Sequence, residues 1–183
     1  HIMFDEKGQK ISPEKLTAII INYCINEDID IESIATTLSN SMLIKKICTK
    51  FNIRYNETNI GFKYFSAYLK ESYKNNKLSL GVESSGGFSL SYHTLDKCGF
   101  IPILIILGIM KKEHKTLGDL SNDIDALIQP LIFIEDAINL ANNNINIKNI
   151  LHANKDQIIQ SINQPVDEIN TNDGLKITFK NED

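Results

Sequence analysis

The fold is decided by one stretch of sequence, Leu78-Ser79-Leu80-Gly81-Val82-Glu83-Ser84-Ser85-Gly86-Gly87-Phe88. It begins as a short apolar run, Leu78 to Val82, which is typical of a buried strand. It then changes to a carboxylate, hydroxyls and glycines. A polar, glycine-rich loop at the carboxyl end of a strand is where open α/β sheets bind their ligands. We therefore interpret residues 83–96, between this strand and a helix that starts near Lys97, as a ligand loop.

Helices and strands alternate on either side of this strand. Turn residues, caps and apolar spacing predict helices at 13–25 and 41–51, strands at 29–37 and 52–57, a helix that carries Phe62, Phe65, Leu69 and Tyr73 on one face, and a helix at 97–112. Such an alternation is typical of βαβ units. The sequence predicts an α/β fold, a three-layer α/β/α domain with a mostly parallel sheet.

The composition changes after Glu113. A helix starts near Thr116, and two apolar stretches flank Pro130 within residues 123–141. A polar, Asn-rich segment at 142–149 precedes a predicted helix at 155–162, and a hairpin follows, with strands at 166–169 and 175–179. A lone hairpin is marginally stable, so we expect a partial α+β C-terminal domain. The expected domains are 1–9, a tag remnant with the end of a preceding domain, then 10–113 and 114–183.

The charge and the apolar runs exclude some partners. The 183 residues have a net charge of −4 and a pI near 5.6, and no basic face favours nucleic acid or an anionic membrane. The longest apolar run, Phe100 to Met110, is shorter than the roughly 20 residues that cross a bilayer. We expect it to form a buried helix. The scattered Cys24, Cys48 and Cys98 predict reduced thiols and a cytoplasmic protein.

The loop itself offers two polar side chains for a ligand. Glu83 and Ser85 lie two residues apart between Gly81 and Gly86, and glycine allows the backbone to turn tightly and approach a ligand. A carboxylate accepts hydrogen bonds from two neighbouring hydroxyls, while a serine can donate or accept. This pair suits a sugar and would repel a bare phosphate. The alternative is a glycine-rich turn with a solvated Glu83.

Three further side chains are candidates at the same edge. Lys63 and Lys97 could each meet an anionic substrate, and His93 could donate a proton or contact the sugar ring. Each could equally be an ordinary solvated side chain. His114 and His152 have no ligand-spaced neighbours, so we predict no metal site in the chain. No Walker loop, nucleophile elbow or Gly-x-Gly-x-x-Gly is present.

Several of these motifs resemble the third domain of the α-D-phosphohexomutases, the family of phosphoglucomutase and phosphomannomutase. Residues 60–64 (IGFKY) are similar to the family's V-G-F-K-[YF], and residues 81–87 (GVESSGG) to G-G-E-E-S-G-G. His93 and Lys97-Cys98-Gly99 fall on H-x-x-x-K-D-G. Residues 35–37 resemble the strand that opens this domain, and residues 167–177 resemble a stretch of the family's fourth domain.

This resemblance implies an enzyme that moves a phosphate between the C1 and C6 oxygens of a hexose through a phosphoserine and a bisphosphate intermediate. It implies Mg²⁺ and glucose 1,6-bisphosphate as cofactors of the full-length enzyme. The third domain would supply the sugar contacts: Glu83 and Ser85 on the 3- and 4-hydroxyls, with Gly86 in the same loop and Lys63, His93 and Lys97 lining the cleft.

The family's serine, metal and phosphate loops (T-A-S-H-N-P, D-G-D-x-D-R and R-P-S-G-T-E-P) have no match in this sequence. We therefore expect a C-terminal fragment that has no catalytic residue and is inactive alone, with hexose phosphate and the missing N-terminal domains as partners. Val82, Ser84 and Cys98 replace the usual Gly, Glu and Asp. The leading interpretation is a phosphoglucomutase. The alternatives are a phosphomannomutase, a phosphoglucosamine mutase or a non-catalytic carbohydrate-binding module.

Overall fold

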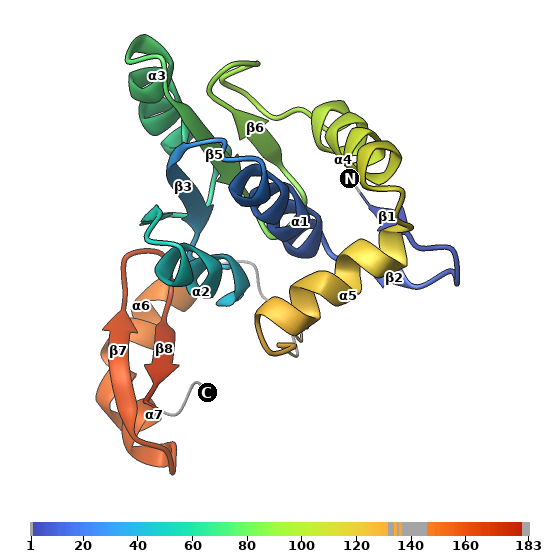
Figure 1. Ribbon diagram of the computed structural model, residues 1–183. Coiled ribbons are helices and arrows are strands. Elements are labelled where there is room, and N and C mark those ends of the chain that lie inside the picture. Colours follow the sequence, from blue (N-terminus) through green and yellow to red (C-terminus); the bar gives the residue numbers. More distant parts are fainter. Residues whose placement is uncertain (1, 132–133, 135, 137–145, 181–183) are drawn as a thin grey trace. The chain divides into compact units, whose positions relative to one another are not determined.

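The computed structural model describes residues 2–131, 134, 136 and 146–180. The chain divides into two compact units, residues 1–133 and 134–183. A four-stranded sheet forms the centre of the first unit (Figure 1). Its strands, in the spatial order β4-β3-β5-β6, are β4 (Arg54–Thr58), β3 (Ile31–Thr37), β5 (Leu78–Val82) and β6 (Phe88–Leu90). The first three are parallel and β6 is antiparallel, which confirms the predicted mostly parallel sheet.

The two central strands present different side chains to the two faces of the sheet. Ile34 pairs with Leu80, and both belong to the larger hydrophobic core. The next pair, Ala35 and Gly81, faces the other way because side chains alternate along a strand. A Cβ on Gly81 would lie 2.9 Å from the ring of Phe65. Glycine therefore makes room for this ring on the second face.

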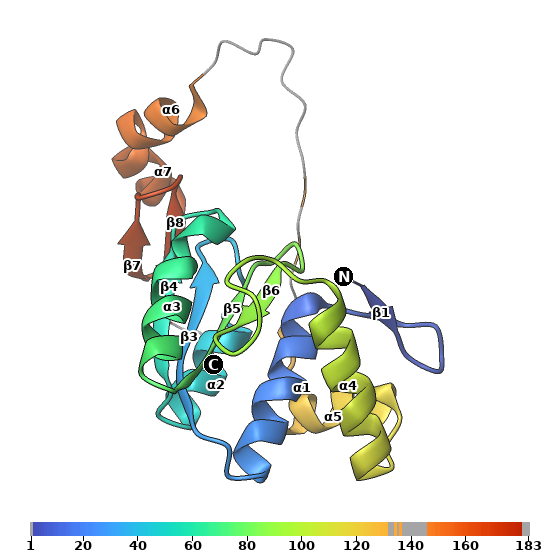
Figure 2. The same ribbon diagram turned by 90° about the horizontal axis from the view of Figure 1, so that it is seen from above.

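Helices cover both faces of the sheet, as predicted. Four helices belong to the larger core: α1 (Pro13–Asn26), α2 (Leu43–Lys50), α4 (Phe100–Glu113) and α5 (Leu117–Leu127). The 3₁₀ turn η1 (Phe62–Tyr64) and α3 (Ser66–Lys74) form a second core with Ala35. Figure 2 shows α3 on one side of the strands and α1, α4 and α5 on the other. The fold is a three-layer α/β/α arrangement.

Helix α1 begins where the sequence indicates. The Ser12 hydroxyl accepts a hydrogen bond from the Lys15 amide, and Pro13 occupies the first turn. Both features favour a helix start, since the cap satisfies an orphan amide and proline has no amide to lose. Seven further residues of α1 besides Glu14 are buried: Leu16, Thr17, Ala18, Ile19, Ile20, Ile21 and Cys24. Helices α2, α4 and α5 all pack on this helix.

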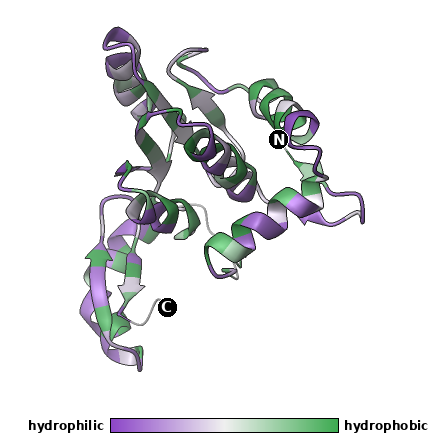
Figure 3. Ribbon diagram, viewed as in Figure 1, coloured by the Kyte–Doolittle hydropathy of each residue, from purple (hydrophilic) through white to green (hydrophobic). Residues whose placement is uncertain are grey.

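Helix α4 is not the buried helix that its composition predicts. Phe100, Leu104 and Leu107 are 79%, 63% and 50% exposed, whereas Ile106 and Ile109 are buried. The helix packs on α1 and β6, and these cover only one of its faces. Figure 3 shows it as mostly hydrophobic along its length. Within the described residues no helix is both long and apolar enough to cross a membrane.

Helix α5 belongs to the first unit, whereas the expected boundary at 113/114 lies ahead of it. It packs on α1 and begins with a capping box between Thr116 and Asp119. The short antiparallel hairpin of β1 (Met3–Phe4) and β2 (Lys10–Ile11) contacts the start of α5. In its turn, the Glu6 carboxylate accepts a hydrogen bond from the Gly118 amide at 3.1 Å. Residues 2–11 are thus tied to this unit by a contact that the sequence did not suggest.

Where the structure describes the second unit, at 134, 136 and 146–180, it contains two short helices and a hairpin. Helix α7 (Lys155–Ser161) and the antiparallel strands β7 (Val166–Asn170) and β8 (Lys176–Phe179) confirm the predicted elements. Helix α6 (Ile147–Ala153) was not predicted; it starts at Asn146, whose side chain caps the Asn149 amide. The apolar stretch after Pro130 and the polar segment before Asn146 lie largely outside the described residues.

Candidate functional site

The loops that follow β3, β4 and β5 lie at one edge of the sheet, because these strands are parallel. The loop after β5 closes as a tight turn. The Glu83 amide donates to the Gly87 carbonyl at 2.8 Å and the Gly86 amide to the Glu83 carbonyl at 2.9 Å. Gly86 has a φ of +93°, a conformation that residues with a Cβ rarely adopt. This turn brings the chain back as β6.

Glu83 is a buried carboxylate, not the solvated one of the alternative interpretation. The residue is only 6% exposed, and its Oε2 atom lies 2.8 Å from Nζ of Lys97. Ser85 donates a long hydrogen bond of 3.4 Å to the same oxygen. A Cβ on Gly87 would lie 2.5 Å from this oxygen. The second glycine therefore provides the space in which the carboxylate folds back over the turn.

Lys97 reaches Glu83 because the chain returns along β6. The Cys98 amide donates to the Phe88 carbonyl at 2.8 Å, which places the neighbouring Lys97 beside the loop. Its ammonium also lies 5.9 Å from the ring centroid of Phe62, a residue of the turn that follows β4. Three segments far apart in sequence, η1, the β5 loop and the segment before α4, therefore meet around one buried carboxylate.

Lys63 and His93 are placed differently. Lys63 lies next to Phe62 in η1, is exposed, and holds its ammonium 5.0 Å from the Tyr64 ring centroid. That His93 lines the same cleft stays a prediction. Because β6 runs antiparallel to β5, the chain at Ser91 is back beside Ser79, and the His93 amide then donates to the Leu90 carbonyl at 3.1 Å. The sequence prediction treated residues 83–96 as one loop and so missed this reversal.

Two hydroxyls beside the loop were not predicted as site residues. Ser39, in the loop after β3, has its Oγ atom 3.0 Å from that of Ser84. From sequence, Ser84 stood out only as a departure from a family motif and Ser39 as the end of a strand. The available signal was that both serines directly follow the carboxyl ends of adjacent parallel strands, where their loops had to meet.

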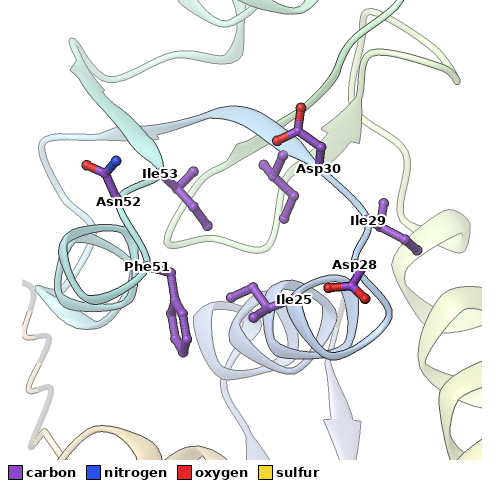
Figure 4. Close-up of a pocket in the computed structure, with 8 residues that line it drawn as sticks. Ile25, Asp28, Ile29, Asp30, Phe51, Asn52 and Ile53 are labelled. Carbon is purple, nitrogen blue, oxygen red and sulfur yellow. The ribbon is translucent and has the colours of Figure 1, made fainter.

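A cavity of about 320 Å³ lies at the opposite edge of the sheet (Figure 4). The residues that line it run from the last turn of α1 to the first residue of β3 and connect α2 to β4: Ile25, Asp28, Ile29, Asp30, Ile31, Phe51, Asn52 and Ile53. None of them was a predicted site residue. The cavity is thus distinct from the loops that hold Glu83.

The described residues do not provide a metal site. Among them, no group of three or more His, Cys, Asp or Glu side chains is arranged to hold a metal ion. The Mg²⁺ that the family resemblance implies therefore does not fit any cluster in this part of the chain.

The arrangement of a mostly parallel sheet between two helical layers, with a buried carboxylate in the loop after a central strand, defines a three-layer α/β/α domain. The family model for the phosphoglucomutase/phosphomannomutase alpha/beta/alpha domain III matches residues 12–127. The chain belongs to this family. The predicted family and fold class are thereby confirmed, and the matched region includes the whole sheet together with α5.

Individual relatives agree with this assignment. The phosphoglucosamine mutase of Limosilactobacillus reuteri is 25% identical over 135 residues, which cover 73% of this chain and 29% of the relative. That of Clostridium botulinum is 29% identical over 130 residues, covering 70% and 28%. A crystal structure of a putative phosphomannomutase from Thermus thermophilus matches with a TM-score of 0.64 and 15% identity, covering 94% of this chain and 34% of that one. The chain spans less than a third of the two curated relatives.

Proposed function

We propose that this chain supplies the sugar-binding part of a phosphohexomutase, an enzyme that interconverts hexose 1-phosphates and hexose 6-phosphates. The observation that carries the proposal is the buried Glu83 carboxylate, which Lys97 holds in a glycine turn at the carboxyl edge of the sheet. Burying a charge is costly unless it is paired. A carboxylate kept in such a place, beside exposed hydroxyls, is suited to binding a polar ligand.

The geometry indicates how a hexose would be held. Lys97 and Ser85 both contact Oε2 of Glu83, which leaves Oε1 to accept a hydroxyl proton of the sugar. The exposed Ser85 hydroxyl can serve a neighbouring hydroxyl. Lys97 and the exposed Lys63 supply positive charge for a phosphate group that arrives over the same edge.

The phosphate transfer itself requires residues that this sequence does not contain. None of the family's serine, metal or phosphate loops named above is found in the 183 residues. We therefore expect this chain to bind hexose phosphate and not to turn it over. Conversion of glucose 1-phosphate by the purified chain would contradict this expectation.

A phosphoglucosamine mutase is the second candidate, and the names of the two curated relatives favour it. The loop sequence favours the first candidate, a phosphoglucomutase, because phosphomannomutases and phosphoglucosamine mutases more often have Met or Gln at the position of Ser84. A comparison of glucose 6-phosphate with glucosamine 6-phosphate as ligands separates the two, since only the second carries an ammonium group on C2.

Amide NMR spectra of the chain titrated with glucose 6-phosphate test the proposal. We expect shifts of the Glu83, Gly86 and Gly87 amides that saturate at millimolar ligand. Glu83→Gln should weaken binding roughly 10-fold or more, because a hydrogen bond to a charged group contributes about 1.5–3 kcal/mol. Ser66→Ala, which removes an exposed hydroxyl bonded to the Lys63 carbonyl, is the control. Equal shifts with inorganic phosphate, or an unaffected Glu83→Gln variant, would refute the proposal.

A further inference from the structure

Four polar side chains form a continuous chain of hydrogen bonds from the end of β3 to the loop after β5, which is the proposed sugar loop. The Thr37 hydroxyl lies 2.7 Å from Oδ1 of Asn40 and 2.9 Å from the Ser39 hydroxyl. The Ser39 hydroxyl lies 3.0 Å from that of Ser84. Thr37 and Asn40 are 1% and 5% exposed. The inner end of the chain is therefore shielded from water.

The direction of every bond in this chain follows from counting protons. The Thr37 backbone amide also donates to Oδ1 of Asn40, at 3.0 Å, so this atom is an oxygen and accepts only. A hydroxyl has one proton to donate. Thr37 donates its proton to Asn40, so the bond between Thr37 and Ser39 must use the Ser39 proton. That leaves the Ser39 oxygen as an acceptor, and the bond to Ser84 must use the Ser84 proton.

Ser84 is consequently an acceptor toward anything in the sugar site. Its only proton is directed at Ser39, and its oxygen retains lone pairs. No other partner of this hydroxyl is found among the described residues. Because Ser84 is half-buried between Glu83 and Ser85, its oxygen adds to the acceptor character of the neighbouring carboxylate.

We propose that Ser84 is a specificity-determining contact that selects a hydrogen-bond donor on the substrate, and that Ser39 is the positioning residue that fixes its polarity. This inference rests on the proposed function. The substrate class is a hexose phosphate with a ring hydroxyl or ammonium group facing Ser84. A carbonyl, ether or fluorine at that position leaves two acceptors opposed, and a site built to pair a donor rejects an analogue that lacks it.

Fluorinated sugars test the inference in the intact chain. Replacing a hydroxyl by fluorine removes the donor and leaves the size of the group nearly unchanged. We expect the dissociation constant of one of the 2-, 3- and 4-deoxyfluoro analogues of glucose 6-phosphate to rise about two- to tenfold through Ser84, the range of a neutral hydrogen bond. Amide NMR titrations give, for each position, the ratio of the dissociation constant of the fluoro ligand to that of the hydroxyl ligand.

The Ser39→Ala variant should lower one of these ratios to about one, because the Ser84 proton is then free to point at the ligand. The ratios at positions that contact Glu83 should stay unchanged. Ser39→Thr keeps the hydroxyl and should retain the wild-type ratios. Since Ser39 is exposed, neither variant removes a core contact. Identical ratios in the wild type and in Ser39→Ala would overturn the inference, even though glucose 6-phosphate still bound.

A ligand-free measurement separates this inference from the proposed function. If the wild type shows no binding of glucose 6-phosphate, the proposed function fails. Neutron diffraction from deuterated crystals then decides the polarity alone. A deuteron on the Ser84 oxygen that points at Ser39 is the expected result, and one that points away from Ser39 overturns the inference.

Discussion

The pairing of Lys97 with Glu83 predicts an asymmetric effect on stability. The Glu83 side chain is 8% exposed and that of Lys97 53% exposed. Lys97→Met leaves a carboxylate in a place where water does not replace the lost partner, whereas Glu83→Gln leaves a lysine that water can solvate. A fully buried broken pair costs about 3–5 kcal/mol and an exposed one about 0–1 kcal/mol. For Lys97→Met we expect about 1–3 kcal/mol, between these limits, and for Glu83→Gln less than about 1 kcal/mol.

Thermal unfolding followed by circular dichroism measures this difference. A loss of about 1 kcal/mol lowers the Tm of a chain of this size by about 2–4 °C, so Lys97→Met should lower it by about 2–12 °C. Lys63→Met is the matched control, because this lysine is exposed and its ammonium lies over the Tyr64 ring, away from any buried carboxylate in the described part of the chain. In a chain that already carries Glu83→Gln, Lys97→Met should change the Tm little.

The reasoning fails if Lys97→Met and Lys63→Met have the same Tm. It also fails if Glu83→Gln destabilises the chain more than Lys97→Met does, since the cost would then lie on the exposed partner. Either result would mean that the Glu83 carboxylate is satisfied in another way, and the argument for a ligand site at this turn would lose its main support.

Two further predictions concern the core. Ile106→Ala should lower the free energy of unfolding in urea by about 2–5 kcal/mol because it opens a cavity. Leu104→Ala, on the exposed face of the same helix, should lower it by less than about 1 kcal/mol. Equal losses would contradict the burial of only one face of α4. Burial raises the pKa of Cys24 to about 11 and that of Cys48 to about 12, so both stay protonated at about pH 8 and should react with a thiol reagent far more slowly than the half-buried Cys98. Three equally fast thiols in the folded chain would contradict this.

The parts of the fold that were predicted from sequence depend on local signals. The cap at Ser12 and Pro13 places the start of α1, and the apolar run of β5 was predicted with its observed bounds. The strand β6 was missed because its three residues, Phe88 to Leu90, carry too short a pattern to recognise. Their strand conformation comes from pairing with β5, which is a tertiary effect that overrides weak propensity.

The missed strand also changes the path of the chain beside Glu83. Because residues 83–96 were predicted to form one loop, His93 and Lys97 were expected at the same edge of the sheet as Glu83. In the structure, the antiparallel strand β6 first carries the chain toward the start of β5. The chain then turns back, and the Cys98 amide donates to the Phe88 carbonyl. Lys97 is therefore beside Glu83, whereas the His93 amide bonds to the Leu90 carbonyl. The path of the chain after Glu83 thus decides which side chain of this segment pairs with the Glu83 carboxylate.

The polarity of Ser84 lies beyond any prediction from local sequence. A serine can donate or accept, and the motif around Glu83 is the same in either case. Only the bonds between Thr37, Ser39 and Asn40 restrict it, because they assign each proton in turn from a fixed acceptor outward. These residues belong to a different strand and its loop, 45 positions earlier in the case of Ser39 and Ser84. The hydrogen-bonding character of Ser84 in the loop after β5 is thus set by the loop after β3, and a change at Ser39 should alter which ligands the β5 loop accepts without altering the β5 loop itself.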